Sequence, residues 1–327
     1  MQALLDSELW QLTANGLVRG TFYAALGAGL ALVIGVTTRF HFAYALTYTV
    51  APYAAFWIMD GVGVPFWPAA LIGLAAAVAV SVLLESGVYE PVARRAADRA
   101  MLAVLVTSIG VSTAGLALLQ LKFGTSGLPF DGPEPSRYDL GPVRISSFDL
   151  EQAATCLVLV IGLAAFLART PIGRSIKAVR SNPGLAGVLG ISVRRINLVC
   201  FAVAGLISGA CALWYALLYT AQPAMGDTVV VYGFVVAFLA GTRSSPLRAL
   251  PVGIGLGLLE QWASHWLPLQ WTQTAVFIVL TGYLAFLAGK DRLPRLRTAR
   301  PAPSKPAPLE PAPLEPATSK RAPLKKV

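Results

Sequence analysis

The stretch "RTPIGRSIKAVRSNPGLAGVLGISVRRIN" (residues 169–197) carries six basic residues and no acidic one, and it lies between two long apolar runs. The run before it covers residues 152–168 and the run after it covers residues 197–219. Apolar runs of roughly 18 residues are long enough to cross the hydrocarbon core of a bilayer. Connections rich in Lys and Arg stay on the cytoplasmic side. The stretch therefore predicts a cytoplasmic connection between two membrane-spanning helices.

The composition extends this prediction to the whole chain. Of 327 residues, 56% are hydrophobic and only 13% are charged, whereas a soluble domain carries about 25% charged residues. The apolar runs are continuous and do not alternate inward and outward as the strands of a membrane β-barrel do. The sequence predicts an all-α, polytopic helical membrane protein.

Apolar runs and flanking charges predict the number of spans and their orientation. Residues 122–151 hold five acidic and three basic residues, so this loop is expected outside, opposite the basic connection 169–196. The acidic N-terminus is expected outside and the basic C-terminal tail inside, and an odd number of spans satisfies all of these constraints. Nine spans are predicted at residues 15–36, 42–59, 66–84, 101–121, 152–168, 197–219, 225–242, 249–266 and 271–289.

The last part of the chain differs in composition from the transmembrane domain predicted at residues 1–289. Residues 290–327 supply +7 of the net charge of +10, and they are rich in Pro with few bulky apolar side chains. Such a segment cannot offset its ordering entropy by burial. A disordered, basic cytoplasmic tail is expected, either in contact with anionic lipid or simply solvated. Because the remaining charge lies in short loops, it is interpreted as a determinant of orientation rather than as a nucleic-acid site.

Within the basic connection, the sequence predicts a short helix. Asn182 is a good N-cap and Pro183 suits the first helical position. Gly190 suits a left-handed stop about two turns later. Leu185, Val188 and Leu189 share one face by their spacing. Two turns are unstable alone in water, so this apolar face is expected to contact the rest of the protein, the lipid interface or another chain.

The stretch "AVRSNPGLAGVLGISVRRINLVCFAVAGLISGACALWYA" (178–216) resembles the cytoplasmic loop and following span of LivH-type permeases, the membrane subunits of branched-chain amino acid ABC importers. Residues 15–36, "ESGVYEPV" (85–92) and residues 230–260 resemble other parts of that family. Together the matches run from about residue 15 to 289.

The resemblance implies a helical permease that imports branched-chain amino acids or a related amide or urea across the bacterial cytoplasmic (inner) membrane. It implies four kinds of partner: cytoplasmic ATP-binding subunits, a second permease subunit that is related or identical, a periplasmic or extracellular solute-binding protein, and membrane lipid. It also implies that the short helix is a coupling helix that docks on the ATP-binding subunit. The implied docking residues are Asn182, Pro183, Leu185, Ala186, Leu189, Gly190 and Ile191.

The chain departs from the family pattern where polar residues of the pathway are expected. The second span opens with "FHFAYAL", which places His41 and Tyr44 at positions where the family pattern has Asn and His. Glu90 stands where the family favours Arg, and the late Gly-rich turn here contains Arg243. His41 and Tyr44 are therefore expected either to line the pathway or to anchor the inner interface.

Three further polar residues interrupt apolar spans. Ionisable groups within a bilayer are costly and suggest function, so Glu260 is expected to line the pathway or to pair across a helix interface. Alternatively, it faces an outer aqueous vestibule near Gln261 and His265. Thr107 and Ser108 either break their helix, contact solute, or bond back to their own helix.

Chemistry within the chain is not expected. The sequence has no G-x-x-x-x-G-K-[ST] loop, so it does not bind ATP by the P-loop route, and ATP is expected on partner subunits. The three cysteines have no metal-ligand spacing, and no catalytic set is recognised, so neither a cofactor nor an enzyme activity is predicted. A stand-alone secondary transporter or channel is the alternative to an ABC permease.

Overall fold

The computed structural model describes residues 2–96, 99–129, 135–141 and 143–268, with single positions between 271 and 285. The chain divides into two units, residues 1–281 and 282–327, and the description below concerns the first. Its helices are α1 (Gln2–Thr37), α2 (Tyr44–Val62), α3 (Phe66–Leu83), α4 (Glu90–Ala96), α5 (Ala100–Phe123), α6 (Ser147–Arg169), α7 (Pro171–Ser181), α8 (Pro183–Val188), α9 (Val193–Leu218), α10 (Met225–Ala240) and α11 (Ala249–Trp266).

Each of the first eight predicted spans coincides with a helix. Within the described residues, five helical stretches are long and apolar enough to cross a membrane, namely Glu8–Thr37, Phe66–Ala96, Ala100–Phe123, Ser147–Arg169 and Val193–Leu218. The ninth predicted span, 271–289, and the predicted tail, 290–327, lie outside the described residues apart from single positions. The helical membrane class is confirmed, whereas the count of nine spans and their orientation stay predictions.

The loop predicted at residues 122–151 contains a β-hairpin, so the all-α prediction is wrong there. Strand β1 (Arg137–Leu140) pairs antiparallel with β2 (Val143–Ser146). These strands have only four residues each, which is too short for a periodic pattern to show in the sequence. Gln11 of α1 holds the hairpin: its side chain donates to the carbonyl oxygen of Arg144 (2.9 Å) and accepts from the Arg144 amide (2.7 Å).

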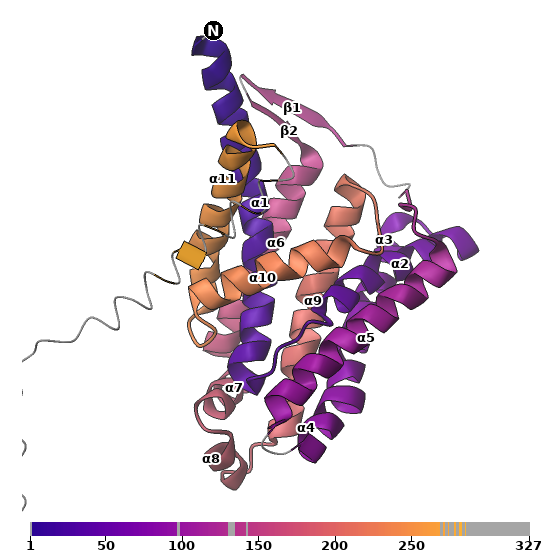
Figure 1. Ribbon diagram of the computed structural model, residues 1–327, viewed down its shortest axis with the longest axis vertical. Helices are drawn as coiled ribbons and strands as arrows, with labels where there is room; N and C mark the ends of the chain where they lie inside the picture. Colours follow the sequence, from indigo (N-terminus) through magenta and orange to yellow (C-terminus); the bar gives the residue numbers. More distant parts are fainter. Residues whose placement is uncertain are drawn as a thin grey trace, which may run out of the picture. The chain divides into compact units, whose positions relative to one another are not determined.

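Helix α1 runs through the bundle and packs against α6, α9, α10 and α11 (Figure 1). It begins at Gln2, well before the predicted start of the first span at residue 15. Its contact with α11 is lined by glycines on both helices: Gly16 and Gly20 meet Gly253 and Gly257. Small residues four apart let two helix backbones approach closely, as the small residues in these spans predict.

The third predicted span does not end where the sequence suggests. Helix α3 continues through a π-helical segment, η1 (Leu84–Tyr89), into α4, so the loop predicted at 85–100 is wrong for most of its length. This long helix packs against α9, where the Ser81 hydroxyl donates to the Phe201 carbonyl oxygen (2.7 Å). Helix α2 stays continuous although Pro52 lies inside it.

Candidate functional site

The basic connection folds into two short helices, α7 and α8, at the end of the bundle opposite the hairpin (Figure 1). Thr170 caps α7 by accepting from the Gly173 amide (2.9 Å). Asn182 ends α7 and caps α8, accepting from the Leu185 amide (3.0 Å). Gly190 has a φ of 83°, the left-handed conformation that ends a helix most easily at glycine. The predicted short helix and its boundaries are confirmed.

No other part of the described chain covers the apolar face of α8. Leu185, Val188 and Leu189 are 58%, 85% and 72% exposed, and we call these three side chains the α8 patch. Of the three coverings that the sequence left open, the described part of the chain is therefore not the one used. Within that part, the patch is an exposed apolar surface.

The other residues of the implied docking set are placed differently. Ala186 is 2% exposed and packs inside, while its carbonyl oxygen accepts from the Ile191 amide (3.0 Å). Asn182, Pro183 and Gly190 are exposed, and Ile191 is half-buried. Exposed basic side chains stand on both sides of α8, namely Arg174, Lys177, Arg194 and Arg195. The α8 patch is therefore preceded by exposed basic side chains on α7, Arg174 and Lys177, whereas Arg194 at the start of α9 pairs with Glu90.

His41, Tyr44 and Ser108 lie together, although two of them were predicted from one span and one from another. His41 and Tyr44 are fully buried and their rings are 5.7 Å apart. His41 Nδ1 lies 3.0 Å from the hydroxyl of Tyr89, and the Phe42 amide donates to Ser108 Oγ (3.4 Å). The structure thus buries all three residues, with Ser108 joined to the segment of His41 and Tyr44 through the Phe42 amide.

The hydroxyls of Thr107 and Ser108 bond back to their own helix. Thr107 donates to the Ala103 carbonyl oxygen (2.7 Å) and Ser108 to that of Leu105 (2.8 Å). Helix α5 is unbroken across both residues. The expectation that these residues break the helix is therefore wrong, because each hydroxyl is satisfied within the turn that precedes it.

Glu260 pairs across the contact of α11 with α1 and α10, far from the His41 cluster in sequence. The Tyr23 hydroxyl donates to its carboxylate (2.6 Å), and the Tyr232 hydroxyl also donates to it (3.4 Å). Arg19 lies 3.4 Å from the same carboxylate. With the Glu260 side chain 12% exposed, the structure shows pairing across a helix interface and not an open vestibule.

Sequence reasoning missed a second set of paired charges around the π-helical segment. Arg39 Nη1 lies 2.6 Å from Glu85 Oε1, and the Asn197 amide donates to the same oxygen (3.4 Å). Glu90 pairs with Arg94 and with Arg194, whose Nε lies 2.7 Å away. The sequence did contain one signal for these pairs: Glu85 is an acidic residue that directly follows the apolar run 66–84.

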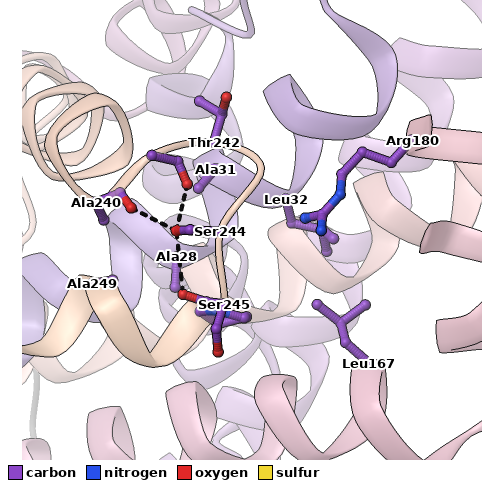
Figure 2. A pocket seen from close by; sticks show the side chains of 12 residues that line it. Ala28, Ala31, Leu32, Leu167, Arg180, Ala240, Thr242, Ser244, Ser245 and Ala249 are labelled. Atoms are coloured by element: carbon purple, nitrogen blue, oxygen red, sulfur yellow. Dashed lines mark hydrogen bonds between the residues drawn. The ribbon is translucent and has the colours of Figure 1, made fainter.

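A small pocket lies between α1, the end of α6 and the start of α11, beside the turn that follows α10. Figure 2 shows Arg180 directed toward this turn, where the Ser244 hydroxyl lies 2.5 Å from the carbonyl oxygen of Ala240. Burial, and then the positive charge of Arg243, lower the pKa of Arg180. Four alanines and two leucines line the pocket together with Thr242, Ser244 and Ser245. Among the described residues, no cluster of three His, Cys, Asp or Glu side chains is placed to hold a metal ion.

The chain is similar to known transport permeases over most of its length. Residues 12–287 match the family described as "Branched-chain amino acid transport system / permease component". The high-affinity branched-chain amino acid transport system permease protein BraD of Pseudomonas aeruginosa is 23% identical over 290 residues, covering 84% of this chain and 93% of that protein. LivH of Escherichia coli K12, a permease protein of the same description, is 23% identical over 281 residues, covering 81% and 89%.

A third relative carries a different name. The ribose import permease protein RbsC of Bacillus subtilis is 32% identical over 108 residues, which cover 33% of this chain and 34% of that protein. No solved structure matches the chain.

Proposed function

The chain belongs to the branched-chain amino acid transport system permease family, and we propose that it is the membrane-spanning subunit of an ABC importer driven by separate ATP-binding subunits. In this proposal the chain binds no cofactor itself, and ATP is bound by its partners. The α8 patch is the observation that carries the proposal, because no other described residue covers it and a docking helix requires an apolar surface of this kind.

The energetics favour a protein partner for the α8 patch. Burying a large aliphatic side chain is worth about 1.5–3 kcal/mol relative to leaving it exposed. Leu185, Val188 and Leu189 are more than half exposed, so covering them would contribute several such increments. The basic edge formed by Arg174 and Lys177 favours an acidic surface around an apolar cleft, which we assign to the ATP-binding subunit.

We infer that the N-terminus lies outside and that α7 and α8 lie inside. Basic residues on the connections after α1, α4, α6 and α10 support this orientation, since such residues accumulate on the cytoplasmic side. The tryptophans mark a membrane interface without distinguishing its side, because Trp is enriched at both interfaces. They lie toward the opposite ends of their helices: Trp10, Trp57, Trp67, Trp214, Trp262 and Trp266.

The remaining partners follow from family membership. We propose a second permease subunit, related or identical, beside this chain, and the bacterial cytoplasmic membrane as the location. A periplasmic or extracellular solute-binding protein would approach the end that carries the hairpin and the first turns of α1. Exposed aliphatic side chains on α3 and α5, such as Leu71, Leu102 and Val106, suit membrane lipid or the second permease.

The proposed solute is a branched-chain amino acid or a related amide or urea. BraD and LivH are named for branched-chain amino acid transport, and they cover most of this chain. The ribose import permease covers a third of it, which makes a sugar the informative competitor in an uptake assay. The buried cluster of His41, Tyr44 and Ser108 and the Glu260 cluster are proposed as polar sites near the pathway.

The experiment is to express the chain with the ATP-binding and solute-binding proteins encoded beside it and to purify the complex. We expect an ATP-binding subunit to copurify and ATP to drive uptake of labelled leucine into proteoliposomes. Val188→Glu and Leu189→Glu should abolish both, because each places a carboxylate in the apolar centre of the docking surface. Competition by unlabelled valine, urea, acetamide and ribose then identifies the solute class.

Ile172→Glu on α7 is the matched control, because Ile172 is also an exposed aliphatic residue (44%) of the basic connection. It should leave copurification unchanged. Uptake that persists without ATP and without a copurifying subunit would refute the proposal and favour a secondary transporter or channel. If Ile172→Glu reduced copurification of the ATP-binding subunit as much as Val188→Glu does, the assignment of docking to the α8 patch would be refuted.

A further inference from the structure

The π-helical segment aligns two carboxylates on one face of the long helix that includes α3 and α4. Residues five apart in an α-helix are separated by about 140° around the axis, so Glu85 and Glu90 would face different directions. Here the Glu90 amide donates to the Glu85 carbonyl oxygen, the five-residue step that defines a π-helix. Both carboxylates consequently face α9, and we call Glu85 and Glu90 the carboxylate pair.

The carboxylate pair binds the first turns of α9. Glu85 accepts from the Asn197 side chain (3.4 Å), and Glu90 accepts from Arg194 (2.7 Å). Asn197 and Arg194 are three residues apart, so they lie on one face of α9. The two helices are thereby joined at two points, one buried and one at the surface.

The same π-helical segment also binds the connection between α1 and α2. Glu85 pairs with Arg39 (2.6 Å), and the Tyr89 hydroxyl lies 3.0 Å from His41 Nδ1. Thr38, directly before Arg39, has a φ of 53°, a conformation that costs a non-glycine residue energy and persists where its surroundings hold it. The segment therefore connects the start of α9 with a strained turn at the inner end of α1.

The start of α9 follows α8 through only four residues, 189–192. This link is held by backbone hydrogen bonds, in which the Ile191 amide donates to Ala186 and the Gly190 amide to Gly187, each at 3.0 Å. Ser192 caps α9 through the Arg195 amide (3.5 Å). A movement of α8 is therefore passed directly to the turn that bears Arg194 and Asn197.

Two atoms of this network lack hydrogen bonds. Glu85 Oε2 and Asn197 Oδ1 are buried, and neither has a partner among the described residues. An unsatisfied buried polar atom costs roughly 1–3 kcal/mol, and buried groups left in this way call for an explanation. An arrangement in which the start of α9 has shifted and these atoms find partners would recover that energy.

We propose that the carboxylate pair Glu85 and Glu90 transmits movement of the docked α8 through Arg194 and Asn197 to the Arg39 turn between α1 and α2. This inference rests on the proposed function, since it requires an ATP-binding subunit on α8. Glu85, Glu90, Arg194, Asn197 and Arg39 act in it as positioning residues and need no contact with solute.

The test compares two neighbouring arginines. Arg194 contacts Glu90, whereas Arg195 is exposed and no side-chain partner is found for it in the described part of the chain. Thr38→Cys provides a single exposed label site at the α1–α2 turn, because the native cysteines Cys156, Cys200 and Cys211 are buried. The complex with its ATP-binding subunits is placed in nanodiscs, and the rate of labelling at residue 38 is measured with and without ATP and vanadate.

We expect trapping with ATP and vanadate to change the labelling rate in the parent protein and in Arg195→Gln. Arg194→Gln and Glu90→Gln should lose this change while keeping the bound ATP-binding subunit, and Arg194→Lys should keep it. The variant with both Arg194→Gln and Glu90→Gln should lose no more of the labelling change than either single variant, because each single substitution already removes the contact between Arg194 and Glu90. Arg194 is 58% exposed, so its substitution does not disturb the core.

Failure of this inference is distinct from failure of the proposed function. If no ATP-binding subunit copurifies with the parent protein, the proposed function is refuted. If the subunit binds but the labelling rate at residue 38 is unaffected by trapping, or if Arg194→Gln behaves as Arg195→Gln does, the transmission route is refuted. Loss of subunit binding in Arg194→Gln would also refute it, since Arg194 would then be part of the docking surface.

Discussion

The close contact between α1 and α11 provides a sharp prediction, because α11 carries an internal control. A β-carbon added at Gly253 would lie 2.6 Å from the Ala24 nitrogen and the Gly20 oxygen, both backbone atoms of α1. A β-carbon added at Gly255, two residues away, would meet nothing within 4 Å. Substitution by Ala therefore introduces a clash at one position and none at the other.

The expected difference in stability between the two variants follows from this comparison. Both substitutions gain the same intrinsic helix propensity, about 1 kcal/mol for Gly to Ala, so this gain cancels in the difference. Carbon atoms pack best at roughly 3.5–4.0 Å, so Gly253→Ala requires α1 and α11 to separate by about 1 Å. Overpacking of this kind costs about 1–3 kcal/mol. We expect Gly253→Ala to be less stable than Gly255→Ala by that amount.

The assay measures the apparent melting temperature of the purified protein in detergent, together with its unfolding in SDS. Gly255→Ala should melt at or above the parent protein, and Gly253→Ala below it. Gly257→Ala, whose added β-carbon meets the backbone of Gly16 and Gly20, should behave as Gly253→Ala does. Equal melting temperatures for the 253 and 255 variants would refute the close helix contact.

Three further predictions concern α8 and the Glu260 cluster. A cysteine at Val188 should react with a membrane-impermeant thiol reagent in inside-out vesicles and not in intact cells, and labelling in intact cells would overturn the orientation. Asn182→Ala removes the cap bond to the Leu185 amide, so α8 should lose about 1 kcal/mol of local stability and its amides should exchange roughly fivefold faster by hydrogen-exchange mass spectrometry. Glu260→Gln weakens the charged acceptor of the Tyr23 and Arg19 bonds and should lower the stability by about 1–3 kcal/mol in the SDS assay, whereas an unchanged stability would contradict the pairing.

Several site features were predictable because they depend on neighbouring residues alone. The α8 helix is determined by Asn182, Pro183 and Gly190, whose side chains and backbone preferences act within a single turn. The helices α2, α5, α9 and α11 follow continuous apolar runs, and their bounds lie close to the predicted spans. The hairpin at 137–146 was missed since its two strands are short and polar and depend on Gln11 of α1 for part of their bonding.

The sequence by itself determined that the chain is a bundle of apolar helices with a basic, capped segment between two of them, since hydrophobicity and capping are local properties of the residues. Only the tertiary structure decided which charges meet: Glu85 with Asn197, and Arg19 with Glu260, are separated by 112 and 241 residues. It also decided that α3 passes into a π-helix, which turns Glu85 and Glu90 toward one neighbour. Such pairings depend on which helices lie side by side, and that is a property of the packed bundle, which no single stretch of sequence contains.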